Sequence, residues 1–256
     1  MATNAPSGTT SFGADALPYA ADVGPIGAVL CHGFTGMPGS MRPWAEGLAA
    51  AGLTVRVPLL PGHGTRWQDA NQVGWEDWYA ELERAVDEVR ARCRRTFVMG
   101  LSMGGTLVTR LAEQRGSDIS GVVVVNGSLF TTRKDAKLLP LLRRVVPSLP
   151  PIGSDIKKAG VSEPAYDRLP VKAAWQLSKL WALTNADLAS LTQPLLVMTS
   201  REDHVVEPEN SERLMTGTGS NDKRQLWLED SFHVATLDND LPVIIDESLA
   251  FIQAHS

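Results

Sequence analysis

Gly100-Leu-Ser-Met-Gly104 is the stretch that decides the fold, because it joins a strand-like apolar run, 96–101, to a helix-like run, 103–114. The pattern G-x-S-x-G between a strand and a helix is typical of a tight turn that exposes a serine hydroxyl. The residues at both ends of such a turn must be small, and the following helix N-terminus favours developing negative charge. We therefore expect Ser102 to be a nucleophile held above the end of a strand.

Short apolar runs alternate with longer amphipathic runs along the rest of the chain. Strands are predicted at 27–31, 53–57, 96–101, 119–126, 194–200 and 224–228, and helices at 42–51, 75–94, 103–114, 209–215 and 241–254. The near-continuous β-branched run at 119–126 is typical of a strand buried on both faces of a parallel sheet. This alternation predicts an α/β fold with a doubly wound, mostly parallel sheet.

One segment, 128–191, shows no clear strand and is far longer than an ordinary loop. It contains Leu138-Leu-Pro-Leu-Leu-Arg-Arg-Val-Val-Pro147 and the proline-rich Leu149-Pro-Pro-Ile152. Long insertions in compact domains are often lids or binding elements, and ligands bind at the carboxyl ends of strands in open α/β sheets. We therefore predict a cap insertion at 128–191 on a core formed by 16–127 and 192–256.

Charge and cysteine content restrict the class of protein. The net charge of −5 over 256 residues argues against nucleic acid as a partner. Residues 1–15 are small and polar, which predicts a flexible tail rather than a signal peptide, and no apolar run reaches the ~18 residues that span a membrane. Cys31 and Cys93 are too few for a disulfide framework. We expect free thiols and a cytoplasmic protein.

A serine hydroxyl is a poor nucleophile until a base takes its proton. In hydrolases with this type of sheet the chain order is serine, acid, histidine, which excludes the two histidines that precede Ser102. His233 lies between the last predicted strand and the last predicted helix, where a loop can return to the serine. We expect His233 to be the base. Its acid is expected on the loop after 194–200, where Glu202 and Asp203 both remain candidates. Asp238 and Asp240 are too near His233 in the sequence to be first choices, and we interpret them as surface or cap residues of the last helix.

The negative oxygen that forms during acyl transfer needs two hydrogen-bond donors. One is the N–H of Met103, directly after the nucleophile, and the other is expected from the loop His32-Gly-Phe-Thr-Gly36, with the N–H of Phe34 as the donor. His32 is expected to hold this loop by hydrogen bonds rather than to act in catalysis. The expected chemistry requires neither a metal nor an organic cofactor. The histidines are too scattered for a metal cluster, and no H-E-x-x-H pattern is present.

From about residue 26 to the C-terminus the chain resembles bacterial monoacylglycerol lipases and the related small carboxylesterases of the α/β-hydrolase superfamily. The matching stretches are His32-Gly-Phe-Thr-Gly36, Pro61-Gly-His-Gly64, Gly100-Leu-Ser-Met-Gly-Gly105, Ile152-Gly-Ser-Asp-Ile156, Ser200-Arg-Glu-Asp-His-Val-Val206 and His233-Val-Ala-Thr-Leu-Asp-Asn-Asp240. The first three stretches occur across many esterases, whereas the last three are much more specific to the lipase branch.

The resemblance implies a catalytic triad of Ser102, Asp203 and His233, with Phe34 and Met103 as oxyanion donors. It thereby resolves the choice of acid, which the residues alone leave open.

The resemblance also implies two substrate contacts in the cap. In that family a cap glutamate binds the glycerol hydroxyls, and Glu163 stands at the matching position, although Pro164 follows it where an aliphatic residue is more usual. Ile152 matches a residue that lines the acyl route. The apolar run at 138–146 fits an acyl chain, and it fits equally well a helix that covers its own core.

The expected activity is therefore that of a monoacylglycerol lipase, which releases a fatty acid and glycerol through an acyl-serine. The expected partner is a small lipid ester, with transient contact between the cap and a membrane or micelle surface, in a monomer or homodimer. The alternatives are a general carboxylesterase for short- to medium-chain esters, an acyltransferase or peptidase with the same triad, and a receptor without turnover. A receptor would be indicated by a missing triad member, and none is missing.

Overall fold

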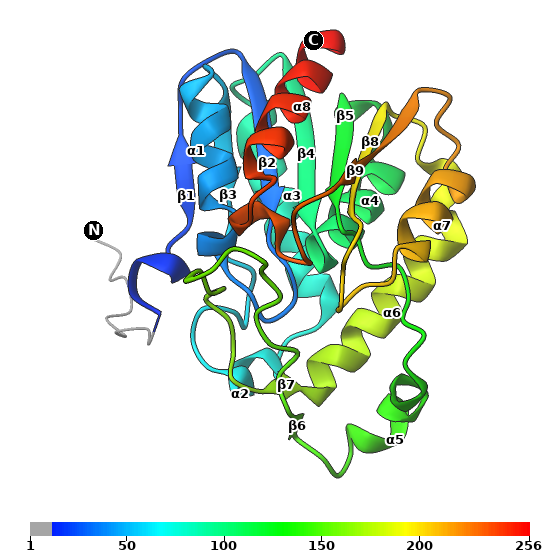
Figure 1. Ribbon diagram of the computed structural model, residues 1–256. Coiled ribbons are helices and arrows are strands. Elements are labelled where there is room, and N and C mark those ends of the chain that lie inside the picture. The colour runs from blue at the N-terminus through cyan, green and yellow to red at the C-terminus, as the bar shows by residue number, and fades with distance from the viewer. Residues whose placement is uncertain (1–11) are drawn as a thin grey trace, which may run out of the picture.

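The computed structural model describes residues 12–256, apart from the side chains of Lys134 and Asp135, and contains a seven-stranded sheet flanked by helices (Figure 1). The strand order is β1-β3-β2-β4-β5-β8-β9, with β1 at Tyr19–Ala21, β2 at Ile26–Cys31, β3 at Thr54–Val57, β4 at Arg95–Leu101, β5 at Gly121–Val125, β8 at Leu195–Ser200 and β9 at Lys223–Leu228. All neighbours pair in parallel except the edge strand β1, which runs antiparallel to β3. The predicted doubly wound, mostly parallel α/β sheet is confirmed.

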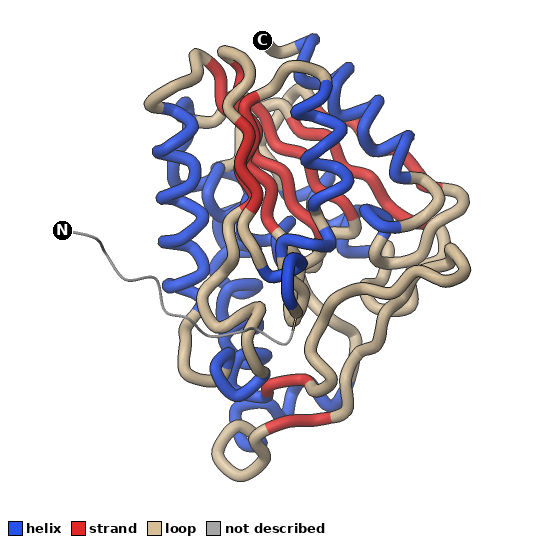
Figure 2. Tube along the Cα trace, turned by 90° about the vertical axis from the view of Figure 1, so that its left-hand side faces the viewer, coloured by secondary structure: helices blue, strands red, loops and turns tan. Residues whose placement is uncertain are grey.

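Helices cover both faces of the sheet, as Figure 2 shows. They are α1 (Arg42–Ala50), α3 (Trp75–Arg90), α4 (Met103–Arg115), α7 (Glu209–Gly217) and α8 (Leu241–Ala254). The short helix α2 (Trp67–Ala70) lies beneath the sheet in Figure 1. Strand side chains alternate between two apolar layers: in β4, Val98 packs in the layer of α3 and α4, and Met99 packs in the layer of α1 and α8. This two-sided burial explains why the central strands are continuous apolar runs.

The segment 128–191 holds few strand residues and lies largely beneath the sheet in Figure 1. It contains a 3-10 helix (Lys134–Leu138), α5 (Leu139–Leu142), the two-residue strands β6 (Ser148–Leu149) and β7 (Leu169–Pro170), and the long helix α6 (Val171–Asp187). Helix α6 packs on α4, and its buried Leu177 and Leu180 belong to the same apolar layer as the central strands. The insertion is therefore fastened to the core along one side of its longest helix.

The remaining short 3-10 helices are Gly13–Ala16, Pro38–Ser40, Gly116–Asp118, Leu188–Ser190 and Ala235–Leu237. Of the predicted N-terminal tail, residues 1–11 lie outside the described residues. The ring of Phe12 lies 5.8 Å from that of Tyr166. Within the described chain, no helix has the length and apolar character needed to cross a membrane. Cys31 and Cys93 are free thiols, as expected.

Candidate active site

Ser102 lies in the sharp turn between β4 and α4, with φ 55° and ψ −120°. Non-glycine residues rarely adopt a positive φ, and such strain persists only where the surrounding structure enforces it. A Cβ atom on Gly104 would lie 2.0 Å from the carbonyl oxygen of Cys31, and one on Gly100 would lie 2.2 Å from the carbonyl carbon of Gly104. The two glycines thus let β2, β4 and α4 meet closely, and Ser102 lines the pocket above them.

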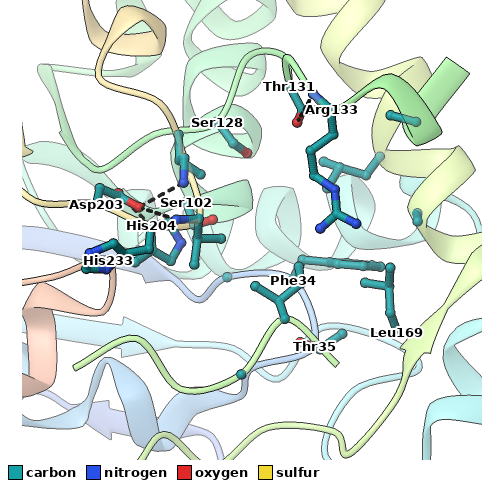
Figure 3. Close-up of a pocket in the computed structure, with 18 of the residues that line it drawn as sticks. Phe34, Thr35, Ser102, Ser128, Thr131, Arg133, Leu169, Asp203, His204 and His233 are labelled. Carbon is teal, nitrogen blue, oxygen red and sulfur yellow. Dashed lines mark hydrogen bonds and ion pairs between the residues drawn. The ribbon is translucent and has the colours of Figure 1, made fainter. Parts of the chain in front are cut away.

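His233 and Asp203 form a hydrogen-bonded pair beside Ser102 (Figure 3). Nδ1 of His233 lies 2.8 Å from Oδ2 of Asp203. The other oxygen of Asp203 accepts the N–H groups of Val205 and Val206, each at 2.8 Å, so this almost fully buried carboxylate is fixed in place. Glu202 is exposed to solvent. The loop after β8 therefore presents Asp203 to the histidine, because the backbone turns around that carboxylate.

The side chains of Ser102 and His233 line the same pocket, and both residues are buried. Among the described residues no hydrogen bond joins the Ser102 hydroxyl to the histidine ring. Contacts between a nucleophile and its base are often long until substrate binds. With Nδ1 directed at Asp203, the Nε2 atom is the ring nitrogen that remains to accept the serine proton.

The pKa of His233 lies above its usual value. Burial lowers this pKa, but the charge and hydrogen bond of Asp203, and the charges of Glu163 and Asp155, outweigh burial. A general base must be neutral. Activity that depends on His233 should therefore fall as the pH drops through this raised pKa.

The loop after β2 runs directly past the serine. A Cβ atom on Gly33 would lie 3.4 Å from Cβ of Ser102, which puts the next residue, Phe34, at the pocket wall. His32 holds this loop: Nδ1 lies 3.0 Å from the Gly33 carbonyl oxygen, and Nε2 accepts the N–H of Leu60 at 3.2 Å. Burial and the neighbouring His63 lower the pKa of His32 to about 3, so its ring is neutral. His32 therefore makes the hydrogen bonds to this loop that the sequence led us to expect.

Met103 is the first residue of α4, and the N–H groups of a first helical turn have no acceptor within the helix. This N–H and that of Phe34 belong to the two segments that flank Ser102. The arrangement suits donors to an oxygen bound next to the serine.

A cavity of about 360 Å³ extends from Ser102 into the segment 128–191. Its volume is within the range of small-molecule sites. Its lining is largely apolar, with Leu101, Phe130, Ala136, Leu139, Leu149, Pro151, Ile152, Leu169, Ala174, Leu177, Trp181, Val205, Val206 and Val234. Ile152 is partly exposed at the outer part of this lining. Figure 3 shows the Ser102–Asp203–His233 group on one side of the pocket and Leu169 on the other.

Glu163 places a carboxyl group in the same pocket. A Cβ atom on Gly36 would lie 2.8 Å from its Oε1 atom, so the carboxyl group rests against the loop after β2. Its backbone is held by an N–H bond to Oγ of Ser154 at 2.8 Å. Burial raises the pKa of Glu163 to about 7, although the charge of His233 opposes this rise. The carboxyl group of Glu163 thus lies in the pocket, although Pro164 follows it where the family usually has an aliphatic residue.

Two carboxylates near the site were not identified from the sequence. Asp155 accepts the N–H groups of His204 and His233, each at 3.1 Å. Asp238, interpreted from the sequence as a surface or helix-capping residue, is only 2% exposed, so that interpretation is wrong. The sequence did offer a signal for both aspartates. Asp155 lies in the stretch 152–156 and Asp238 in the stretch 233–240, and both stretches match the family.

The comparisons with known proteins agree with this geometry. Residues 27–240 match the model of a family described as "Serine aminopeptidase, S33". The protein belongs to this family. It is a serine hydrolase with the α/β-hydrolase fold, as the sequence predicted.

Two curated relatives span nearly the whole of this serine hydrolase. It is 43% identical over 241 residues to the thermostable monoacylglycerol lipase of a Bacillus species, which covers 93% of this chain and 95% of that protein. It is 22% identical over 237 residues to a carboxylesterase of Bacillus subtilis, covering 92% of this chain and 96% of that protein.

Solved structures give the same result. The structure described for LipS and LipT, two metagenome-derived lipolytic enzymes, superposes with a TM-score of 0.92 at 42% identity, covering 94% of this chain and 99% of that one. The monoacylglycerol lipase of Paleococcus ferrophilus superposes with a TM-score of 0.76 at 20% identity, covering 94% of this chain and all of that one. At 20% identity the second match supports the fold alone.

Proposed function

We propose that this hydrolase cleaves carboxylic esters of lipids, with monoacylglycerols as its substrate class, through an acyl-enzyme on Ser102. The observation that carries the proposal is one pocket that combines three features. It holds a strained serine at a helix N-terminus beside a histidine–aspartate pair, an apolar lining from the cap, and the carboxyl group of Glu163. The 43% identity to a protein named a thermostable monoacylglycerol lipase supports the same substrate class.

The proposed reaction has two steps, each with His233 as the proton carrier. His233 takes the Ser102 proton as the hydroxyl oxygen attacks the ester carbonyl, and the N–H groups of Phe34 and Met103 hold the resulting oxyanion. The tetrahedral intermediate expels glycerol, which receives its proton from His233, and leaves an acyl-serine. A water molecule, deprotonated by His233, then attacks the acyl carbon. The second tetrahedral intermediate breaks its bond to Oγ of Ser102, which takes the proton back from His233, and the fatty acid is released. Asp203 stays ionised and keeps Nδ1 of the ring protonated.

The two ends of a monoacylglycerol fit the two parts of the pocket. The fatty acyl chain suits the apolar lining contributed by residues 128–191, with Ile152 near its outer part. The glycerol head carries two free hydroxyls, and a carboxylate accepts hydrogen bonds from both. We assign this contact to Glu163 and regard 128–191 as a cap over a catalytic core of 16–127 and 192–256.

The cap also presents apolar side chains to solvent at the outer end of the molecule, where α5 lies in Figure 1. Leu138, Leu141 and Val145 are each more than half exposed, while Leu139 in the same segment lines the pocket. Exposed apolar clusters are typical of interaction surfaces. We propose that this face of the cap touches the membrane or micelle that holds the substrate.

Replacing the nucleophile tests the proposal directly. Purified wild-type protein and Ser102→Ala are compared on monoacylglycerols of increasing chain length and on short acyl esters. Removal of a triad member should lower kcat by about 10⁴-fold. Residual activity within about tenfold of wild type would overturn the assignment of Ser102. A wild-type rate confined to short acyl esters would instead indicate a general carboxylesterase.

A further inference from the structure

Two stretches that are about 80 positions apart in the chain lie against each other behind the histidine. One is the cap segment Ile152–Ile156, and the other is the loop His233–Asp240. The main-chain N–H of Val234 donates to the main-chain oxygen of Asp155 at 3.0 Å. The proposed reaction gives neither Asp155 nor Asp238 a role, yet both carboxylates lie at this contact.

The Asp155 carboxylate reaches from the cap to both loops of the proposed triad. Its Oδ2 atom accepts the N–H of His233 and the N–H of His204, the residue next to Asp203, each at 3.1 Å. Its Oδ1 atom lies 2.8 Å from Nδ1 of His204. One cap side chain therefore binds the main chain of the base and the main chain beside the acid.

Asp238 makes the reciprocal contact, from the histidine loop to the cap. Its two oxygens accept the N–H groups of Lys157 at 2.7 Å and Lys158 at 2.9 Å. They also accept the N–H groups of Phe232 at 2.9 Å and Asn239 at 2.8 Å. Asp155 and Asp238 thus connect the cap segment and the histidine loop in both directions. Four main-chain donors on one buried carboxylate leave this loop little freedom to move relative to the cap segment.

We propose that Asp155 is a positioning residue for His233. The cap segment 152–158 is then a fixed part of the catalytic apparatus and not part of a moving lid. The inference rests on the proposed function, because it takes His233 to be the base and Asp203 its acid. Holding the main chain of His233 sets where its ring projects. A displacement of about 1 Å at a catalytic group can cost roughly 100-fold in rate.

Asp155 also acts on His233 through its charge. Three charged groups raise the pKa of His233: Asp203 from the loop after β8, and Glu163 and Asp155 from the cap. Removing the Asp155 charge should lower that pKa. Since the neutral ring is the base, the acidic limb of the pH–rate profile should then move to lower pH. A purely structural role of Asp155 would not move this limb.

The test compares wild type with Asp155→Asn and Asp155→Ala. The asparagine keeps one oxygen that can accept the His233 N–H but carries no charge, whereas the alanine removes both. Asp246→Asn is the matched control, because Asp246 is an exposed carboxylate on α8 that makes no hydrogen bond or ion pair with any described residue. The readouts are kcat and KM for a short acyl ester across pH, the rate of Ser102 phosphonylation by a small fluorophosphonate, and thermal unfolding.

We expect Asp155→Ala to lower kcat and the phosphonylation rate by about 10- to 100-fold, with KM changed by less than about threefold. Asp155→Asn should recover part of that loss, and both variants should show the acidic limb of the pH–rate profile at lower pH. Asp246→Asn should match wild type in every readout. Wild-type kcat and an unmoved limb in both Asp155 variants would overturn the inference. The inference would also be overturned if kcat fell only in proportion to the loss of folded protein while the acidic limb of the pH–rate profile stayed at its wild-type pH.

Phosphonylation separates this inference from the function on which it rests. If wild-type Ser102 is not phosphonylated, the proposed function fails and this inference fails with it. If wild type is phosphonylated and the Asp155 variants react at the same rate, only the positioning role of Asp155 is overturned.

Discussion

At the scale of single residues, Glu163 combines a carboxyl group with a largely apolar pocket, and its pKa is raised to about 7. Glu163→Gln keeps the shape but replaces one acceptor oxygen by a donor. We expect KM for a monoacylglycerol to rise about tenfold or more, since a hydrogen bond to a charged group contributes about 1.5–3 kcal/mol. KM for a short alkyl ester without a diol should stay unchanged. Steady-state kinetics on both substrates checks this, with Asp167→Asn, an exposed carboxylate of the same cap segment, as the control.

The same substitution predicts a pH-dependent change in stability. An ordinary glutamate has a pKa of 4.5, so between that pH and about 7 the folded protein holds a proton on Glu163 that the unfolded chain has released. The free energy of unfolding therefore falls as the pH rises through this window and stays reduced above it. Glu163→Gln removes this loss. The variant should have a higher Tm than wild type above pH 7 and a similar Tm below pH 4.5. Equal Tm differences at both ends would contradict the assignment of the raised pKa.

At the scale of elements, the segment around α5 carries the proposed lipid contact. Leu141 and Val145 are 63% and 74% exposed, so replacing both by serine costs little packing. We expect this double variant to lose activity several-fold on monoacylglycerol in vesicles while its rate on a dissolved short ester is unchanged. Val243→Ser, an exposed apolar position on α8, is the control and should change neither rate. Equal losses on both substrates would place the defect in the pocket instead.

How far the sequence predicts an element depends on how local its signal is. The turn at Ser102 and the strand at 119–126 were found because their patterns arise from their own residues, and Leu241–Ala254 matched its predicted bounds. The strand Tyr19–Ala21 was missed, since three residues carry no periodicity and its pairing partner β3 is more than 30 positions away. The burial of Asp238 was missed for the same reason. Its carboxylate binds the N–H groups of Lys157 and Lys158, which lie about 80 positions earlier in the chain.

At the scale of the whole molecule, the proposed cap at 128–191 and the sheet share one apolar layer. The α6 residues of that layer belong to one apolar cluster with residues of β2, β4, β5 and β8, and α6 itself packs on α3 and α4. Arg110 on α4 bonds Asp187 at the end of α6 at 2.6 Å. A cap that had its own core would unfold in a step of its own. Because the buried residues of α6 belong to the same apolar core as the sheet, we predict that both parts unfold in one cooperative transition.

Leu180→Ala on α6 tests this prediction, because Leu180 is a cap residue with no exposed surface. Its truncation should cost about 2–5 kcal/mol and lower the Tm of the entire protein by several degrees, since it opens a cavity in the shared layer. Leu183→Ala, on the same helix but 39% exposed, should shift the Tm far less. Differential scanning calorimetry checks the outcome. A separate early transition that moves with Leu180→Ala, while the main transition stays in place, would show instead that 128–191 is an independent domain.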